Sequence, residues 1–173
     1  MLIISSEKNG NDYSSVQFNL PENISKQIQR WGDDNIDESD VYTEAGFGRE
    51  DNTHVTVKYG FHTNNVEEIE KIVNGYGSFE IILGKISKFT SAEDFDVVKI
   101  EVKGQKLHEL HELLNELPNS DSHPDYQPHC TVSYVKKGKC NNLSGNTKFR
   151  GERMIVRELV FSSKSGNKTK IKL

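Results

Sequence analysis

The sequence predicts a single α+β domain that is built from two similar halves. The chain has 173 residues, a length that suits one domain with its own core. The expected order is strand, helix, strand, helix, strand, followed by strand, helix, strand, strand, and each half contains one strand with a His-x-Thr motif. We expect two lobes over about residues 13–90 and 96–173. Two pseudo-symmetric antiparallel sheets, flanked by helices, would then surround a central cleft.

The first half begins with a strand over residues 13–20, where apolar and polar side chains alternate up to Pro21. Apolar residues at i, i+4 and i+7 then predict a short helix over 21–31. The first His-x-Thr strand follows at 54–60. The remaining expected elements are a helix from Asn64 or Asn65 to Gly75 and a strand over 79–89 with a bulge at Gly84.

The second half begins with a strand over residues 98–102, in which valine and isoleucine alternate with charged residues. A leucine stripe predicts a helix over 104–117. Pro128 holds the chain extended before the second His-x-Thr strand at 129–135. The remaining expected elements are a strand over 154–161, a turn at 165–167 and a last strand over 169–173.

An acidic segment at residues 32–53 separates the first helix from the first His-x-Thr strand. Charge runs of this kind are usually solvated surface loops. Long loops inside compact domains also often act as functional lids, and Tyr42 and Phe47 would let this one stack on a base. The sequence leaves both interpretations open.

The two His-x-Thr motifs are His54-Val55-Thr56 and His129-Cys130-Thr131. Side chains alternate between the two faces of a strand, so each motif places its His and Thr together on one face and its apolar residues on the core face. One such motif is unremarkable on a solvated strand. Two copies in matching contexts indicate paired imidazoles that act as general acid and base on a phosphodiester, beside hydroxyl donors.

With Pro128 before the second histidine, the two motifs resemble those of the 2H phosphoesterase superfamily, which includes bacterial 2′-5′ RNA ligase-like proteins and cyclic phosphodiesterases. The resemblance covers roughly residues 14–161. It implies a bilobal α+β fold with His54, Thr56, His129 and Thr131 as catalytic residues. By analogy, His129 would activate the attacking water and His54 would protonate the leaving group. The sequence from Asp51 to Gly60 also resembles that of a subgroup often found in bacteriophage genomes.

Other residues are candidates for substrate contacts. Lys58 shares the expected face of His54, and Ser133 is its counterpart in the other half; Lys58 can equally be a lysine at a strand end that reaches solvent. Tyr13 and Tyr134 can contact a base or phosphate, although the alternation turns Tyr134 toward the core.

His108 and His111 lie three residues apart on the predicted helix over 104–117, but they miss the zinc protease pattern. We interpret both as residues on the helix surface. We therefore expect no metal site and no cofactor.

Composition limits the partners and the compartment. The net charge of −4 disfavours a protein that wraps extended nucleic acid, and a small nucleotide suits it better. Cys130 and Cys140 form neither a metal pattern nor a disulfide framework. The apolar run at the N-terminus is too short for a signal peptide, and no stretch approaches the length of a membrane span. We expect a cytoplasmic protein, in the host cytoplasm if a phage encodes it; the sequence leaves the oligomeric state open.

The favoured function is a metal-independent phosphodiesterase. Its substrate would be a small nucleotide with a 2′,3′-cyclic phosphate, a 2′-5′ linkage or a cyclic signalling structure. The resemblance to the phage subgroup implies evasion of anti-phage defence, through degradation of a cyclic nucleotide signal, as the biological role. One alternative is a nucleotide-binding sponge without turnover. The other is an RNA end-processing or ligation factor, which the acidic charge disfavours.

Overall fold

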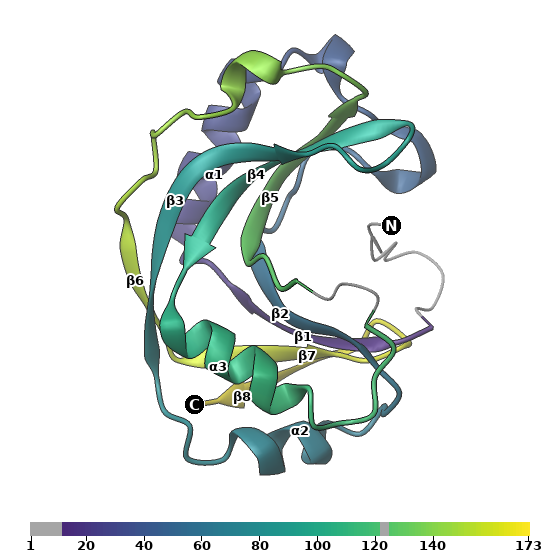
Figure 1. Cartoon of the computed structure of the whole chain (residues 1–173), viewed down its shortest axis with the longest axis vertical. Coiled ribbons are helices and arrows are strands. Elements are labelled where there is room, and N and C mark those ends of the chain that lie inside the picture. The colour runs from purple at the N-terminus through teal and green to yellow at the C-terminus, as the bar shows by residue number, and fades with distance from the viewer. Residues whose placement is uncertain (1–11, 122–124) are drawn as a thin grey trace.

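The computed structural model describes residues 12–121 and 125–173, which form one curled antiparallel sheet with three helices (Figure 1). The order of strands in the sheet is β6-β3-β4-β5-β2-β1-β7-β8. The strands are β1 (Ser14–Asn19), β2 (His54–Phe61), β3 (Phe79–Phe89), β4 (Phe95–Lys103), β5 (His129–Lys136), β6 (Arg153–Val156), β7 (Glu158–Ser162) and β8 (Lys168–Lys172). The helices are α1 (Glu22–Asn35), α2 (Val66–Val73) and α3 (Gln105–Leu114), with 3-10 turns at Glu38–Asp40, Glu44–Gly46 and Asn141–Leu143. The short apolar run at the N-terminus lies outside the described residues.

Most of the expected elements are present, and local chemistry explains their ends. The Asn65 side chain accepts a hydrogen bond from the Glu67 amide and caps α2, as its sequence predicts. The predicted bulge at Gly84 is confirmed by a register shift between Leu83 and Ile86 in the pairing of β3 with β4. The helix α1 continues to Asn35, four residues beyond its expected end.

The chain contains two repeats of strand, helix and strand, namely β1-α1-β2 and β4-α3-β5. The next long strand of each repeat joins the other half of the sheet, because β3 pairs with β4 and β7 pairs with β1. The expected division at residues 90–96 therefore separates two strands that are hydrogen-bonded neighbours. Each half of the sheet therefore contains strands from both halves of the sequence.

Two expectations about the strands are wrong. The two sheets are one sheet, because β2 and β5 pair directly at Val55 and Cys130 and so join the halves. The single strand expected over 154–161 is two strands separated by Arg157, with β6 paired to β3 and β7 paired to β1. The alternation of apolar and polar residues does not show where the chain stops pairing with one strand and begins to pair with another.

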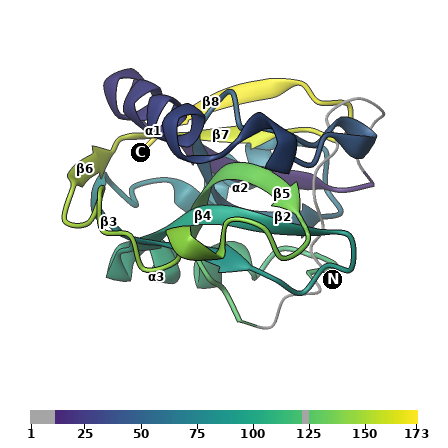
Figure 2. The same cartoon turned by 90° about the horizontal axis from the view of Figure 1, so that it is seen from above.

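The helices α1 and α3 occupy equivalent positions in the two halves. Each packs on the His-x-Thr strand of the other repeat, α1 on β5 and α3 on β2. Seen from above, they lie on opposite sides of the middle strands (Figure 2). The approach of α1 is close, since a Cβ atom at Gly32 would lie 3.0 Å from Cγ1 of Val132. The buried stripe of α3, including Leu107, Leu110 and Leu114, completes the core beneath β2 and β3.

Each His-x-Thr strand contains a bulge just after its motif. On β2, Thr56 pairs with Gln17 and Lys58 pairs with Val16, so Val57 is an extra residue. On β5, Thr131 pairs with Lys99 and Ser133 with Val98, which makes Val132 the extra residue. A bulge places two residues of one strand opposite a single residue of the other and so reverses the alternation beyond it.

Beyond the bulges, other segments cover the edges of β2 and β5. Residues 41–50 run beside β5, with bridges from Val41 to Val135 and from Arg49 to Ser133. Residues 118–121 run beside β2, and Gly60 has a φ of +98° where a Cβ would lie 3.1 Å from the backbone of Ser120. Part of the acidic segment is therefore paired with β5. The segment as a whole is not a solvated loop, and it is not a detached lid.

Candidate active site

The four motif residues meet where the two halves of the sheet join. Val55 and Cys130 are partners in the antiparallel pair and both are fully buried. Extending this register by one residue in each direction places His54 opposite Thr131 and Thr56 opposite His129. Directly opposed side chains have Cβ atoms roughly 4.5–5.5 Å apart. All four motif side chains share the face opposite the core, which we call the site face, and all four are partly exposed.

Backbone carbonyls fix the orientation of both imidazoles. Nδ1 of His54 lies 2.9 Å from the carbonyl oxygen of Asn52, and Nδ1 of His129 lies 2.7 Å from that of Gln127. A carbonyl can only accept, so Nδ1 carries the proton in each ring. In each neutral imidazole Nε2 is therefore the nitrogen that can take up a proton. Both rings thus keep Nε2 available for proton transfer, as a base when the ring is neutral and as an acid when it is protonated.

Flanking strands extend the site face with residues that the sequence analysis missed. The neighbours of the motifs are Asn19 beside His54, Gln17 beside Thr56, Lys99 beside Thr131 and Glu101 beside His129. The alternation over 98–102 already separated the lysine and glutamate of β4 from its apolar residues. It did not say which water-facing surface they join, because strand order is not written in the sequence.

Lys58 and Ser133 do not share a face with the motifs. The bulges turn both toward the core, where Nζ of Lys58 contacts Asp121 Oδ2 at 2.7 Å and Asn115 Oδ1 at 2.9 Å. The Ser133 hydroxyl is fully buried and donates to the carbonyl of Tyr134. The structure therefore gives neither residue the expected position for touching a substrate.

Beyond the bulges, Tyr59 and Tyr134 lie on the site face in place of Lys58 and Ser133. Tyr134 belongs to a group of four rings with Tyr42, Phe47 and Phe95, whose neighbouring centroids lie 4.9–5.9 Å apart. Burial raises the pKa of Tyr134 to about 12, against the opposing effect of a hydrogen bond with the side chain of Thr131. We call these four residues the ring cluster; it reaches the motif through that hydrogen bond.

The smaller aromatic group of the other half contains Tyr13. Its ring meets Tyr59 edge-on at 6.0 Å and stacks on His62 at 5.8 Å. The Nε2 atom of His62 lies 2.7 Å from the Ser120 hydroxyl, which ties this group to the segment that covers the edge of β2. Each half of the site therefore has aromatic side chains near its bulge, and among residues 12–121 and 125–173 the second half has the larger group.

His111 and the partly buried Tyr126 support the first motif from behind. His111 is buried, not on the helix surface as expected, and its Nδ1 lies 2.7 Å from the carbonyl of Val57. Its ring stacks on Tyr126 at 4.0 Å, and the Tyr126 hydroxyl donates to the carbonyl of Thr56 at 2.7 Å. His108 is exposed as expected. Burial lowers the pKa of His111, since charging it there would cost solvation.

Two further features complete the description. Among residues 12–121 and 125–173, no group of three or more His, Cys, Asp or Glu side chains is arranged to hold a metal ion. No helix in this part of the chain is long and apolar enough to cross a membrane.

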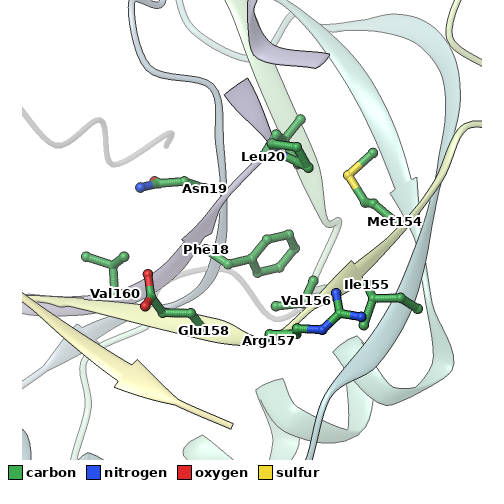
Figure 3. A pocket seen from close by; sticks show the side chains of 10 residues that line it. Phe18, Asn19, Leu20, Met154, Ile155, Val156, Arg157, Glu158 and Val160 are labelled. Atoms are coloured by element: carbon green, nitrogen blue, oxygen red, sulfur yellow. The ribbon is translucent and has the colours of Figure 1, made fainter. Parts of the chain in front are cut away.

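A pocket of about 180 Å³ lies beside the end of β1 (Figure 3). Its wall is mixed, apolar at residues such as Phe18 and Leu20 and polar at Asn19, Arg157 and Glu158. Asn19 is also the strand partner of His54, so the pocket begins one strand away from the first motif.

Comparisons with known proteins identify the family of the chain and agree with its fold. The profile of the 2′-5′ RNA ligase superfamily matches residues 20–161. A structure of Escherichia coli LigT complexed with 3′-AMP has a TM-score of 0.64 and 17% identity, with 94% of this chain and 95% of that one covered.

TT0787 of Thermus thermophilus has a TM-score of 0.62 and 15% identity, with 93% and 97% covered. Kluyveromyces marxianus Usb1 with uridine monophosphate has a TM-score of 0.54 and 8% identity, with 94% and 99% covered. At these identities the structures establish a shared fold. No curated protein sequence in the comparison matches the chain.

Proposed function

Because the chain belongs to the 2′-5′ RNA ligase superfamily of 2H phosphoesterases, we propose that it is a phosphodiesterase whose two His-x-Thr motifs cleave a small nucleotide. The observation that carries this proposal is the square of His54, Thr131, Thr56 and His129 on one face, with both Nδ1 atoms bonded to carbonyls. Two imidazoles in the same tautomer, beside two hydroxyls, are suited to acid and base chemistry at a single phosphorus.

The reaction needs two proton transfers. For a 2′,3′-cyclic phosphate, one histidine takes a proton from water as the new P–O bond forms. The other histidine starts as the imidazolium and gives its Nε2 proton to the ribose oxygen as the P–O bond to that oxygen breaks. We assign the base to His129 and the acid to His54, with Thr56 and Thr131 donating to the non-bridging oxygens where charge grows.

The substrate is proposed to be small. The structures of E. coli LigT and K. marxianus Usb1 are complexes with 3′-AMP and uridine monophosphate, which supports a nucleotide as the ligand of this site. The ring cluster next to Thr131 offers aromatic surface for a base, and base stacking contributes roughly 1–3 kcal/mol. The candidates are 2′,3′-cyclic mononucleotides, 2′-5′ oligonucleotides and cyclic signalling nucleotides such as those used in anti-phage defence.

A chromatographic screen tests the proposal and separates these substrates. Purified protein, with EDTA present, is incubated with each class of nucleotide, and the products are resolved against a control in which both His54 and His129 are replaced by alanine. We expect turnover of at least one class by the native protein and none by the control. Native protein that binds a nucleotide tightly and leaves it intact would instead support a sponge, and cleavage limited to long RNA ends would support an RNA-processing role.

A further inference from the structure

Three lysines of the described residues have buried side chains, and one of them differs from the others. Lys58 pairs with Asp121 at 2.7 Å, and Lys88 pairs with Asp96 at 2.8 Å. Lys99 is 5% exposed, yet within residues 12–121 and 125–173 it has no carboxylate at ion-pair distance. Its Nζ atom instead contacts the Ser87 hydroxyl at 2.7 Å.

An aromatic ring is the other close contact given by the ammonium of Lys99. Its ammonium lies 4.2 Å from the centroid of the Phe89 ring. Burial lowers the pKa of Lys99, and the repulsion of Lys85 adds to this while the more exposed Glu101 opposes it. A buried charge is normally paired, because its lost solvation must be offset. A hydroxyl and an aromatic face offset only part of that cost.

The position of this unpaired cation is the second observation. Lys99 is the strand partner of Thr131, so its side chain stands on the site face beside the second motif. The Phe89 ring that it contacts also meets the His129 ring edge-on at 4.8 Å. The lysine is therefore adjacent both to the hydroxyl and to the imidazole of one half of the site.

We propose that Lys99 is the phosphate-binding cation of this site and that its ammonium contacts the non-bridging phosphoryl oxygens beside Thr131. The anion that would balance its charge is then supplied by the ligand. The flexible four-carbon stem lets the ammonium turn from Ser87 toward a bound phosphate while it stays on the same face. This inference rests on the proposed function, since it assigns a residue to the same site.

The equivalent position in the other half supports an asymmetric role. There the strand partner of Thr56 is Gln17, a neutral amide that lies 3.5 Å from Asn19. The two motifs are alike, but the strand partner of the threonine is a cation in the second and a neutral amide in the first. A phosphoryl group held by Lys99 is thus drawn toward Thr131 and His129, which is where developing negative charge is stabilised most.

The test uses inorganic phosphate as the probe and two lysine variants of the full chain. Lys99→Met removes the charge and keeps an unbranched side chain, and Lys58→Met does the same at the buried lysine that has a carboxylate partner. Calorimetry gives the dissociation constant of phosphate, and thermal unfolding gives the Tm. Lys99→Gln provides a second neutral variant should Lys99→Met fail to fold.

We expect Lys99→Met to weaken phosphate binding by about tenfold or more, the usual effect of losing a charged hydrogen bond. Its Tm should be unchanged or higher, because a buried charge without a carboxylate is removed. Lys58→Met should lower the Tm and leave the phosphate constant within about twofold, since that lysine points away from the site.

For the substrate found by screening, kcat/KM of Lys99→Met should fall by at least the same factor as phosphate affinity. Lys99→Met, or Lys99→Gln in its place, that binds phosphate as tightly as the native protein overturns the inference. Native protein that does not bind phosphate overturns it as well. Both results are obtained without turnover, so they are distinguishable from a failure of the proposed activity, which appears as native protein that cleaves none of the nucleotides.

Discussion

The two His-x-Thr strands have matching backbones, but different groups hold their bulges. The carbonyl of Val132 on β5 accepts a hydrogen bond from the backbone amide of Glu50 at 3.0 Å. The equivalent carbonyl of Val57 on β2 faces the imidazole of His111 at 2.7 Å. One half is thus supported by neighbouring backbone and the other by a buried side chain that can titrate. The two halves thus keep the same positions for their reacting groups, while the groups that support the two bulges differ.

The largest effect is expected where the halves are most alike. His54→Ala and His129→Ala should each lower kcat by about 10³-fold or more, because each ring has its own proton transfer. The double variant should be little worse than either single, since one missing member already disables the pair. Single-turnover rates measure this, with circular dichroism to confirm folding. A single variant that keeps its rate within tenfold of native would show that the halves do not contribute equally.

The second prediction concerns the segments that cover the edges of β2 and β5. Lys58→Met leaves Asp121 without its buried lysine, and we expect a loss of about 3 kcal/mol in the free energy of unfolding. Arg49 holds the other segment through the carbonyls of Gly32 and Ile36, but from a partly exposed site. Arg49→Met should therefore cost only about 1 kcal/mol.

Urea unfolding measures both values. The double variant Lys58→Met with Asp121→Asn is the control, and it should recover part of the loss because the unbalanced carboxylate is removed. Equal losses for Lys58→Met and Arg49→Met would show that burial of the ion pair does not distinguish the two edges.

The third prediction separates the aromatic groups of the two halves. Phe47 belongs to the ring cluster beside Thr131, and Tyr13 to the smaller group around Tyr59. If the base stacks on the ring cluster, Phe47→Ala should raise KM by about tenfold with little change in kcat. Tyr13→Ala should change KM by less than about threefold. Steady-state kinetics on the substrate from the screen decide between them, and the reverse order of effects would move the base to the first half.

The sequence predicted the shared face of the four motif residues better than their surroundings. The motif residues His54, Thr56, His129 and Thr131 were found because alternation and repetition are local signals, and the structure gathers them on one face. The orientation of Lys58 and Ser133 was wrong because one extra residue in each strand reverses the alternation, and nothing in the motif marks a bulge.

The rest of the fold and of the site could not be predicted, because it depends on pairing between strands that are far apart in sequence. Lys99 reads as an ordinary outward lysine on a strand until β4 is known to lie next to β5. The union of the two sheets and the division of 154–161 into two strands also depend on partners that are far apart in sequence. His111 was misplaced because the helix α3 buries more than its leucine stripe against β2.

The smallest expected effect concerns His111, the titratable side chain that supports the bulge of β2. Because burial lowers the pKa of His111 in the folded protein, the unfolded chain binds a proton more readily around the ordinary value of 6.5. The contribution of the neutral ring is therefore complete above about pH 6.5 and is lost as the pH falls below it. We expect the unfolding free energy of the native protein to fall as the pH drops below about 6.5, with a slope of at most about 1.4 kcal/mol per pH unit for one proton. His111→Gln should be less stable at neutral pH but flatter across this window. His108→Gln, on the exposed side of the same helix, serves as the matched control and should keep the native slope. A native slope that persists in His111→Gln would assign the pH dependence to other groups, and the two bulges would then be equally insensitive to acid.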